Sequence, residues 1–353
     1  MDDKIEIPCC NLGNTPEFPE YPSDELVKEI LEHVRVTGKP YTWRGHSHTK
    51  PAKGAKVLYR EEFDVAERDG NGGWSPCPCC RPHSRAFKHK GKIAWFPEES
   101  VIRLIGPVCF EKLNPEGHQE ALAELRARQK RDADIRSITL HLGVLEPTID
   151  VVEAMLSIVA DVERCSDDLR HAFEELKVPL WREAQDGVLR VRKTRMIDYV
   201  KADGQSGSRP DEYFESVGRI AGIAMLHKFS RSPERSLQTT LAGLRGLVGR
   251  LSGRSDLAEL PDDERIWMKD ALVRGRSTIE EIVQSVTERR PFLHKASIAA
   301  LKDWGRHPDS QYGLRVRREG DVITLSSGRS EKRVRVGKHT ERELPALPPL
   351  SNE

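Results

Sequence analysis

The chain of 353 residues carries four of its seven cysteines in one short stretch, CPCCRPHSRAFKHKGKIAWFPEESVIRLIGPVC, from Cys77 to Cys109. Cys77 and Cys80 have the C-x2-C spacing at which two thiolates on a tight turn reach the same tetrahedral zinc ion. The opening residues, MDDKIEIPCC, show no basic or apolar leader, so we expect a cytoplasmic chain with reduced thiols. In that compartment, clustered cysteines indicate a metal site before disulfides.

The residues after this turn predict a small β element and a third ligand. Two strand-like segments, 92–96 and 101–105, are joined by the turn PEES, and Cys109 follows where we expect a helix to start. A helix N-terminus favours the thiolate form that binds metal. This order of knuckle, hairpin and ligand resembles a treble-clef zinc module, and the IGPVC element resembles small bacterial and phage domains of unknown function that end in a G-I-G-P-x-C signature. Both resemblances cover only this segment and imply a metal site without any chemistry.

The segment offers several candidates for the fourth ligand. A treble clef usually supplies this ligand one turn after the third, where this chain has Lys112 and Leu113. We rank the candidates in the order His83, His89, Cys79 and His118. An open fourth position would make the zinc catalytic, but the HxE-type signature of zinc deaminases is absent. We therefore expect one structural zinc ion, with the ligands Cys77, Cys80, His83 and Cys109.

The segment 148–177 has the pattern of a long helix with one apolar seam. Its apolar residues recur at steps of three and four from Ile149 to Leu176, which is the spacing of a coiled coil or a long helical hairpin. Cys165 falls in this seam, so we expect it to be a buried core residue and not a ligand. The seam predicts either a homodimer through 148–177 or pairing with the preceding helix of the same chain.

The segment 261–337 resembles a winged helix-turn-helix domain. Helices are predicted over 261–273, from a capping box at Ser277 and Glu280, and over 292–305; two alternating segments then meet at a turn over 319–321. The resemblance implies that the third helix is a recognition helix and that the turn belongs to a wing. The residues expected to contact nucleic acid are His294, Lys295, Ser297 and Lys302 on the helix, with Arg317 and Arg318 on the wing.

The composition predicts a mainly helical chain with small β elements, since 37% of the residues are hydrophobic and 32% are charged. No apolar run approaches the roughly 20 residues that a membrane helix needs. The predicted divisions are an N-terminal tail and basic region (1–73), the zinc module (74–114), a long helical or coiled-coil region (115–201), a linker (202–211), a helical region (212–260), a winged-helix-like domain (261–340) and a disordered tail (341–353).

The formal net charge of +1 conceals separate basic zones. Residues 35–60 contain seven Lys or Arg and residues 81–92 contain five, with no Asp or Glu in either range. Residues 312–342 contain nine, against four acidic residues. Such segregation lets a nearly neutral chain present basic faces to a polyanion, or it reflects solvated loops and strands that are paired with acidic helices.

The first basic zone also contains aromatic residues and histidines. Tyr41, Trp43 and Tyr59 lie among its cations, either to stack on single-stranded nucleic acid or to form a small core. His46 and His48 are predicted to be exposed in a basic loop. The alternatives are a second metal site or a catalytic pair, because residues that alternate along a strand share one face.

These observations leave three functions open. The first is a zinc-containing nucleic-acid-binding protein of regulator type, for which DNA and RNA are not distinguished. The second is an oligomeric assembly or adaptor protein of phage or mobile-element type that holds a protein partner. The third is a zinc-dependent hydrolase or nuclease, although the chain has no P-loop, GxSxG or HExxH motif and we assign no catalytic residue.

Overall fold

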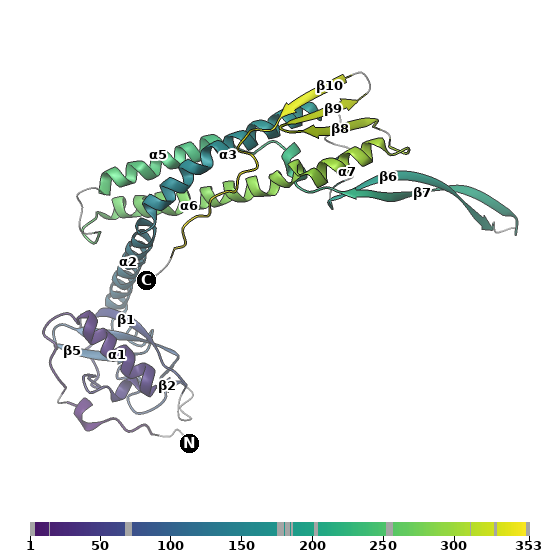
Figure 1. Cartoon of the computed structure of the whole chain (residues 1–353). Coiled ribbons are helices and arrows are strands. Elements are labelled where there is room, and N and C mark those ends of the chain that lie inside the picture. Colours follow the sequence, from purple (N-terminus) through teal and green to yellow (C-terminus); the bar gives the residue numbers. More distant parts are fainter. Residues whose placement is uncertain are drawn as a thin grey trace. The chain divides into compact units, whose positions relative to one another are not determined.

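The computed structural model consists of two compact units, Met1–Ala133 and Asp134–Glu353 (Figure 1). Helices predominate and the sheets are small and antiparallel, which agrees with the predicted fold class. No helix among the described residues is both long enough and apolar enough to cross a membrane. The structure describes residues 4–13, 15–67, 73–174, 180, 184, 186–200, 204–251, 257–310, 312–327 and 330–350.

The first unit combines helix α1 (Asp24–Thr37) with a three-stranded antiparallel sheet. The Ser23 side chain accepts a hydrogen bond from the Leu26 amide at 3.4 Å and caps the start of α1. Gly38, in the left-handed conformation with φ 63°, ends it. The sheet has the order β1 (Leu58–Asp64), β4 (Lys90–Phe96) and β5 (Val101–Ile105), and the short strands β2 (Trp74–Ser75) and β3 (Phe87–Lys88) pair beside it.

The core of the first unit is built on the predicted hairpin β4–β5. All residues of β4 after Lys90 are buried, because β4 is the central strand and both of its faces are covered. The Phe96 ring packs edge-on against Phe110, with ring centroids 5.4 Å apart. Burial of each such side chain contributes about 1.5–3 kcal/mol to the free energy of folding. Because Phe110 belongs to the turn that contains Cys109, its packing on Phe96 holds this turn against the hairpin.

The helix that the sequence predicts to start at Cys109 starts later. Residues 107–113 form successive turns, and α2 (Pro115–Leu142) begins at Pro115. The Asn114 side chain accepts a hydrogen bond from the Gly117 amide at 3.0 Å. An Asn cap followed by proline is a strong start signal, since proline has no amide to leave unsatisfied. Cys109 therefore lies in a turn, and the helix dipole does not act on its thiol.

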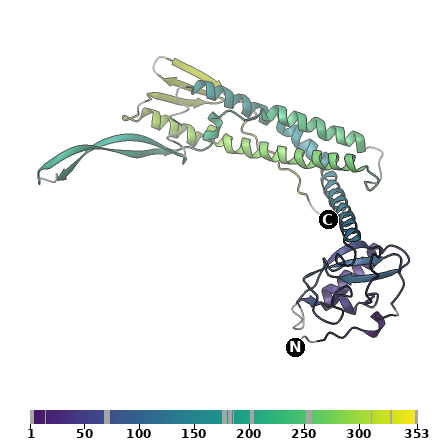
Figure 2. The same cartoon turned by 180° about the vertical axis from the view of Figure 1, so that it is seen from behind.

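The second unit is organised around α3 (Leu145–Ala172), α5 (Pro233–Leu251) and α6 (Asp262–Arg289), which lie side by side (Figure 1, Figure 2). The apolar seam of α3 faces this core, and Cys165 within it is 1% exposed, which confirms its predicted core role. The main partner of α3 is α5, and not the preceding helix, which was one of the two predicted alternatives. The seam is thus covered within the chain, and the homodimer through 148–177 stays a prediction.

Helix α6 continues through 274–277, where the sequence predicts one helix to end and the next to begin. Its buried apolar residues form one continuous stripe: Met268, Leu272, Ile279, Ile282 and Val286. A cap contributes about 1 kcal/mol, whereas each buried apolar side chain contributes about 1.5–3 kcal/mol. Packing therefore overrides the capping box, and Glu280 instead pairs with Arg276 at 2.9 Å. The helix order implied by the winged-helix resemblance is wrong over 261–289.

The elements after α6 agree better with the prediction. Helix α7 (Lys295–Arg306) occupies the place of the predicted third helix. Strands β8 (Leu314–Glu319) and β9 (Val322–Ser327) meet at Gly320, whose φ is 59°. A third strand that the predicted two-strand wing does not include, β10 (Ser330–Arg335), pairs with β9. The result is a three-stranded meander packed on α7 and α3.

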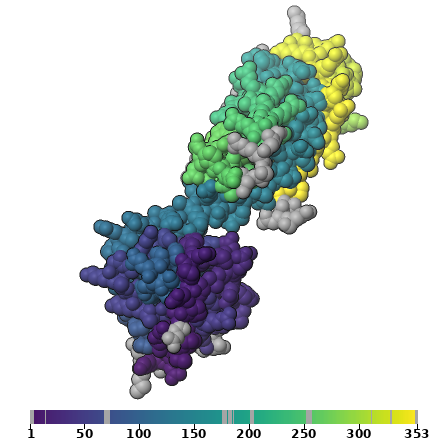
Figure 3. Space-filling view, turned by 90° about the vertical axis from the view of Figure 1, so that its left-hand side faces the viewer, coloured from purple at the N-terminus to yellow at the C-terminus, as the bar shows by residue number. Residues whose placement is uncertain are grey.

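The C-terminal segment packs on the second unit, so the predicted disorder is wrong for residues 341–350. Arg290 Nε donates to the Thr340 carbonyl at 2.7 Å, and Arg276 Nη1 donates to the Pro348 carbonyl at 3.0 Å. The yellow C-terminal residues lie along the teal residues of α3 in Figure 3. Side chains from other elements satisfy this irregular backbone, which a local sequence pattern does not reveal.

Strands β6 (Val188–Val200) and β7 (Ser206–Arg219) form a long antiparallel ribbon that extends away from the helices (Figure 1, Figure 2). The helical assignments of 188–200 and 212–219 are therefore wrong, as is the linker over 206–211; residues 202 and 203 lie outside the described part. A two-stranded ribbon has two free edges, which tolerate Pro210. Trp304 Nε1 of α7 donates to the Arg190 carbonyl at 2.7 Å and anchors the ribbon.

Replacing Gly305 with alanine is expected to destabilise the second unit by about 3 kcal/mol or more, because overpacking against backbone is not relieved by a rotamer change. A Cβ atom at Gly305 would lie 2.1 Å from the Leu314 carbonyl oxygen. The matched control is Gly246→Ala on α5, where nothing lies within 4 Å. Thermal denaturation should show a lower melting temperature for the first variant only; equal melting temperatures would contradict this packing.

Candidate metal centre

The sulfur atoms of Cys77, Cys80 and Cys109 converge in the first unit, all within 4.8 Å of one another. Cys80 Sγ lies 3.5 Å from Cys109 Sγ, and all three residues are free thiols. Cys77 is buried, Cys109 is half-buried and Cys80 is exposed. Thiolates are preferred donors of zinc. The three predicted cysteine ligands are therefore brought together as a donor set that fits one metal ion.

Backbone hydrogen bonds fix the positions of these thiols. The amide of Arg81 donates to the Cys77 carbonyl at 3.0 Å, and the Cys77 amide donates back to Arg81 at the same distance. This closes the tight turn that the C-x2-C spacing predicts. A Cβ atom at Gly106 would lie 2.5 Å from Cys109 Sγ, so glycine allows the chain to bring Cys109 to the turn.

The thiols also influence one another electrostatically. A hydrogen bond from Cys77 is the main cause that lowers the pKa of the Cys80 thiol to about 6, with smaller contributions from Cys109 and Lys112. The hydrogen bond to Cys77 and burial raise the pKa of Cys109. The cluster thus already favours a thiolate at its exposed member, which is the form that coordinates metal.

The structure does not add any candidate fourth ligand to the cluster. His83 and His89 are exposed, and their ring nitrogens do not join the group. Cys79 is buried next to Cys77, but its sulfur does not lie within 4.8 Å of all three ligands. His118 Nδ1 lies 2.6 Å from the Tyr59 hydroxyl. No fourth His, Cys, Asp or Glu of the described residues joins the group, and His83 as the fourth ligand stays a prediction.

Comparison of the chain with family models, curated proteins and solved structures finds no match. The treble-clef and winged-helix resemblances therefore gain no support from known proteins.

His46 and His48, predicted to be exposed, are buried and bonded to each other. His46 Nε2 lies 2.8 Å from His48 Nδ1, and their side chains are 0% and 3% exposed. His46 Nδ1 accepts from the Leu104 amide at 3.0 Å, and His48 Nε2 lies 2.7 Å from the Pro82 carbonyl oxygen. The pair thus links β5 to the loop that follows the cysteine knuckle.

The backbone groups at the two ends of this hydrogen-bonded series determine the tautomers of the two histidines. The Leu104 amide can only donate, so His46 carries its proton on Nε2 and donates it to His48. The Pro82 carbonyl can only accept, so His48 Nε2 donates. Burial is the main cause that lowers the pKa of both imidazoles below the ordinary 6.5, His46 well below it. The pair therefore serves the fold as two neutral rings and has no free nitrogen for a metal.

The first unit is expected to lose stability as the pH falls below 6.5. The folded-state pKa values are lowered, so the unfolded chain binds protons first and the stability is complete only above 6.5. Each imidazole that must stay neutral lowers the free energy of unfolding by about 1.4 kcal/mol per pH unit below that point. Hydrogen exchange of β4 and β5 in increasing urea, at several pH values, measures this.

The control is His46→Gln with His48→Gln, which removes the two titrating groups and leaves the cysteines in place. This variant should be less stable at neutral pH but lose less stability on acidification than the unchanged chain. Protonation of thiolates acts equally on both proteins, so the difference isolates the histidines. An equal pH dependence in the two proteins would show that the pair does not titrate on unfolding.

The aromatic residues of the first basic zone mostly belong to the core. Trp43 is 3% exposed and Tyr59 is 2% exposed, while Tyr41 is half-buried. Trp43 stacks on Phe18 with ring centroids 6.0 Å apart. Trp43 and Tyr59 are therefore core residues, the second of the two alternatives, and not a stacking platform for bases.

The residues predicted to bind nucleic acid on the second unit are only partly available. Ser297 is buried, and its hydroxyl donates to the Pro291 carbonyl at 2.9 Å. Arg318 donates to the Leu293 carbonyl and pairs with Glu341 at 2.6 Å, and Arg317 pairs with Glu319 at 3.4 Å. His294 and Lys295 are exposed, and Lys302 is half-buried. This face therefore offers few unpaired cations.

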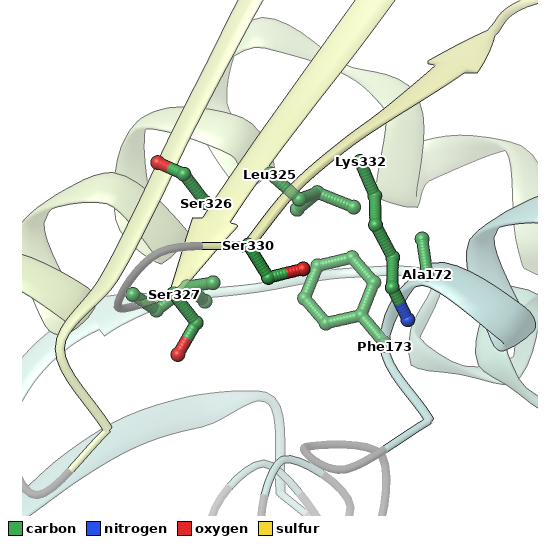
Figure 4. A pocket seen from close by; sticks show the side chains of 8 residues that line it. Ala172, Phe173, Leu325, Ser326, Ser327, Ser330 and Lys332 are labelled. Atoms are coloured by element: carbon green, nitrogen blue, oxygen red, sulfur yellow. The ribbon is translucent and has the colours of Figure 1, made fainter.

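A small cavity of about 80 Å³ lies between the end of α3 and the meander (Figure 4). Phe173 and Leu325 line its apolar part, and the Lys332 side chain runs past Ala172. The Lys332 ammonium donates to the His171 carbonyl at 3.2 Å. Lys332 is thus the one cation among the described lining residues and is already bonded to the backbone, and these residues bring together no catalytic groups.

Proposed function

We propose that this chain is a zinc-containing nucleic-acid-binding protein, with a structural zinc held by Cys77, Cys80 and Cys109 and the binding surface on the first unit. The observation that carries the proposal is a set of exposed cations that form no ion pair with any described acidic residue. We call this set the zinc-side cations: Arg44, Lys50, Lys53, Lys56, Arg81, Arg85, Lys90 and Lys112.

Tertiary contacts connect the loops that carry these cations. His48 bonds to Pro82 and ties the loop 44–56 to the loop after the knuckle. The Asn114 side chain donates to the Ala55 carbonyl at 3.2 Å and ties the same loop to the turn with Lys112. Lys112 acts electrostatically on Cys80. Folding of the metal site would therefore hold several positive charges on connected loops, which suits a polyanionic backbone.

The proposal is tested with the whole chain, loaded with zinc, by fluorescence anisotropy titrations against labelled duplex DNA, single-stranded DNA and RNA. Binding should weaken as the salt concentration rises, because counterions are released from the phosphates. The three probes distinguish DNA from RNA and duplex from single strand. Absence of salt-sensitive binding to all of them at micromolar protein would rule the proposal out.

The alternative, an assembly or adaptor protein, is favoured by one feature of the second unit. Three apolar side chains on the ribbon β6–β7 are unusually exposed: Met196 at 61%, Val200 at 71% and Phe214 at 60%. Apolar residues exposed on an extended ribbon are typical of surfaces that a partner covers. Light scattering at micromolar concentration tests self-association, and a mass of 40.0 kDa, that of a monomer, would exclude a homo-oligomeric assembly.

A further inference from the structure

The donor set of the metal centre contains three thiols, and zinc in proteins is usually four-coordinate. The thiols of Cys77, Cys80 and Cys109 come together without a fourth His, Cys, Asp or Glu among the described residues. His118 is engaged by the Tyr59 hydroxyl, and the rings of His83 and His89 lie outside the group. A metal on these sulfurs therefore keeps one coordination position that the described part of the chain does not fill.

The exposure of the three cysteines indicates the side from which the fourth coordination position is accessible. Cys77 is buried in the core, Cys109 is half-buried and Cys80 is exposed. The position is thus accessible from the side of Cys80, where solvent meets the cluster. Glycine at 106 keeps the other side closely packed, since a Cβ atom there would meet Cys109 Sγ at 2.5 Å.

The charges near this side favour an anionic donor. Lys112 is exposed and acts on Cys80, and Arg81 is exposed in the turn that the cysteines form. The Lys92 ammonium donates to the Pro107 carbonyl at 2.6 Å and acts on Cys109. Three thiolates on a divalent ion leave one negative charge, and these cations offset the further charge that an anionic fourth ligand brings.

We infer that the metal centre binds an exogenous thiolate at its fourth position, through a face bordered by Cys80, Arg81 and Lys112. This inference rests on the zinc site of the proposed function. Such binding would involve no redox change: the thiol would give its proton to bulk water, and its sulfur would take the position that the three cysteines leave to solvent. A soft sulfur donor suits a metal that is already held by thiolates.

Cobalt(II) in place of zinc gives a direct test in the full chain, prepared with a phosphine reductant so that no small-molecule thiol is present. The sulfur-to-cobalt charge-transfer absorption should match three thiolates at first. Addition of 2-mercaptoethanol should raise it by about one third, as four sulfurs replace three around the tetrahedral ion. The variant His83→Ala should give the same response.

Three results would overturn the inference. Absorption of four thiolates before the addition would mean that another cysteine of the chain closes the site. A cobalt spectrum that does not change on addition of 2-mercaptoethanol, but that differs in the His83→Ala variant, would show that His83 is the fourth ligand. The site would then be closed. In both cases cobalt binds and the metal site itself stands. Absence of any thiolate-to-cobalt absorption would instead refute the metal site together with the inference.

Discussion

Replacing Cys77 and Cys109 with serine is expected to abolish metal binding and to unfold the first unit while the second unit stays folded. Structural zinc sites contribute about 10–16 kcal/mol of binding free energy, whereas a domain is stable by only about 5–15 kcal/mol in total. Cys77 is 0% exposed and lies in the same core as Phe87 and Phe110. Loss of the metal therefore removes most of the stability of that core.

Metal analysis and hydrogen exchange of β4 and β5 measure the two effects separately. The matched control removes the same number of thiols through Cys9→Ser with Cys10→Ser, since both residues are exposed and outside the cluster. This control should keep its metal and its exchange protection. Unchanged metal content and protection in the Cys77, Cys109 variant would show that the cluster is a metal-free part of the core.

Neutralising Arg81, Arg85 and Lys112 together is expected to weaken nucleic-acid binding and to flatten its salt dependence. Each lost phosphate contact lowers the slope of the logarithm of the binding constant against the logarithm of salt concentration by about 0.9 on duplex DNA. The three alanine substitutions should therefore reduce the slope by up to about 2.7. Exposed substitutions usually change stability by less than about 0.5 kcal/mol, so the first unit should remain folded.

The control for this prediction carries the same charge change on the second unit, as Lys295→Ala, Lys302→Ala and Arg317→Ala. Arg318 is excluded because its internal hydrogen bonds hold the fold together. Binding that weakens only in the first variant would place the surface among the zinc-side cations. Binding that weakens only in the control would show that the nucleic-acid-binding surface lies on the predicted recognition helix and wing.

The features that the sequence predicted well are those with a local cause. The C-x2-C turn needs only a few residues, and the turn at Gly320 needs only one residue with positive φ. Cys165 was predictable because its neighbours in the helical period are apolar. In each case the information lies within one turn or one strand of the residue concerned.

The features that the sequence missed depend on distant partners. His46 and His48 are buried because the Leu104 amide and the Pro82 carbonyl satisfy them, and neither partner is visible from a short polar loop. Helix α6 continues past Ser277 because its apolar stripe is covered on both sides of that residue. The ribbon β6–β7 resembles a linker in composition, and only cross-strand pairing such as Arg195 with Asp211 makes it regular.

The central claim is that the three thiols hold a metal, and the zinc content of the purified chain tests it most directly. The protein is purified without added metal or chelator, and its zinc is measured against protein concentration. We expect one zinc ion per chain, which a cysteine-directed reagent releases and which Cys77→Ser with Cys109→Ser fails to retain. A chain that is folded, with reduced cysteines and no bound zinc or other metal, would contradict the claim.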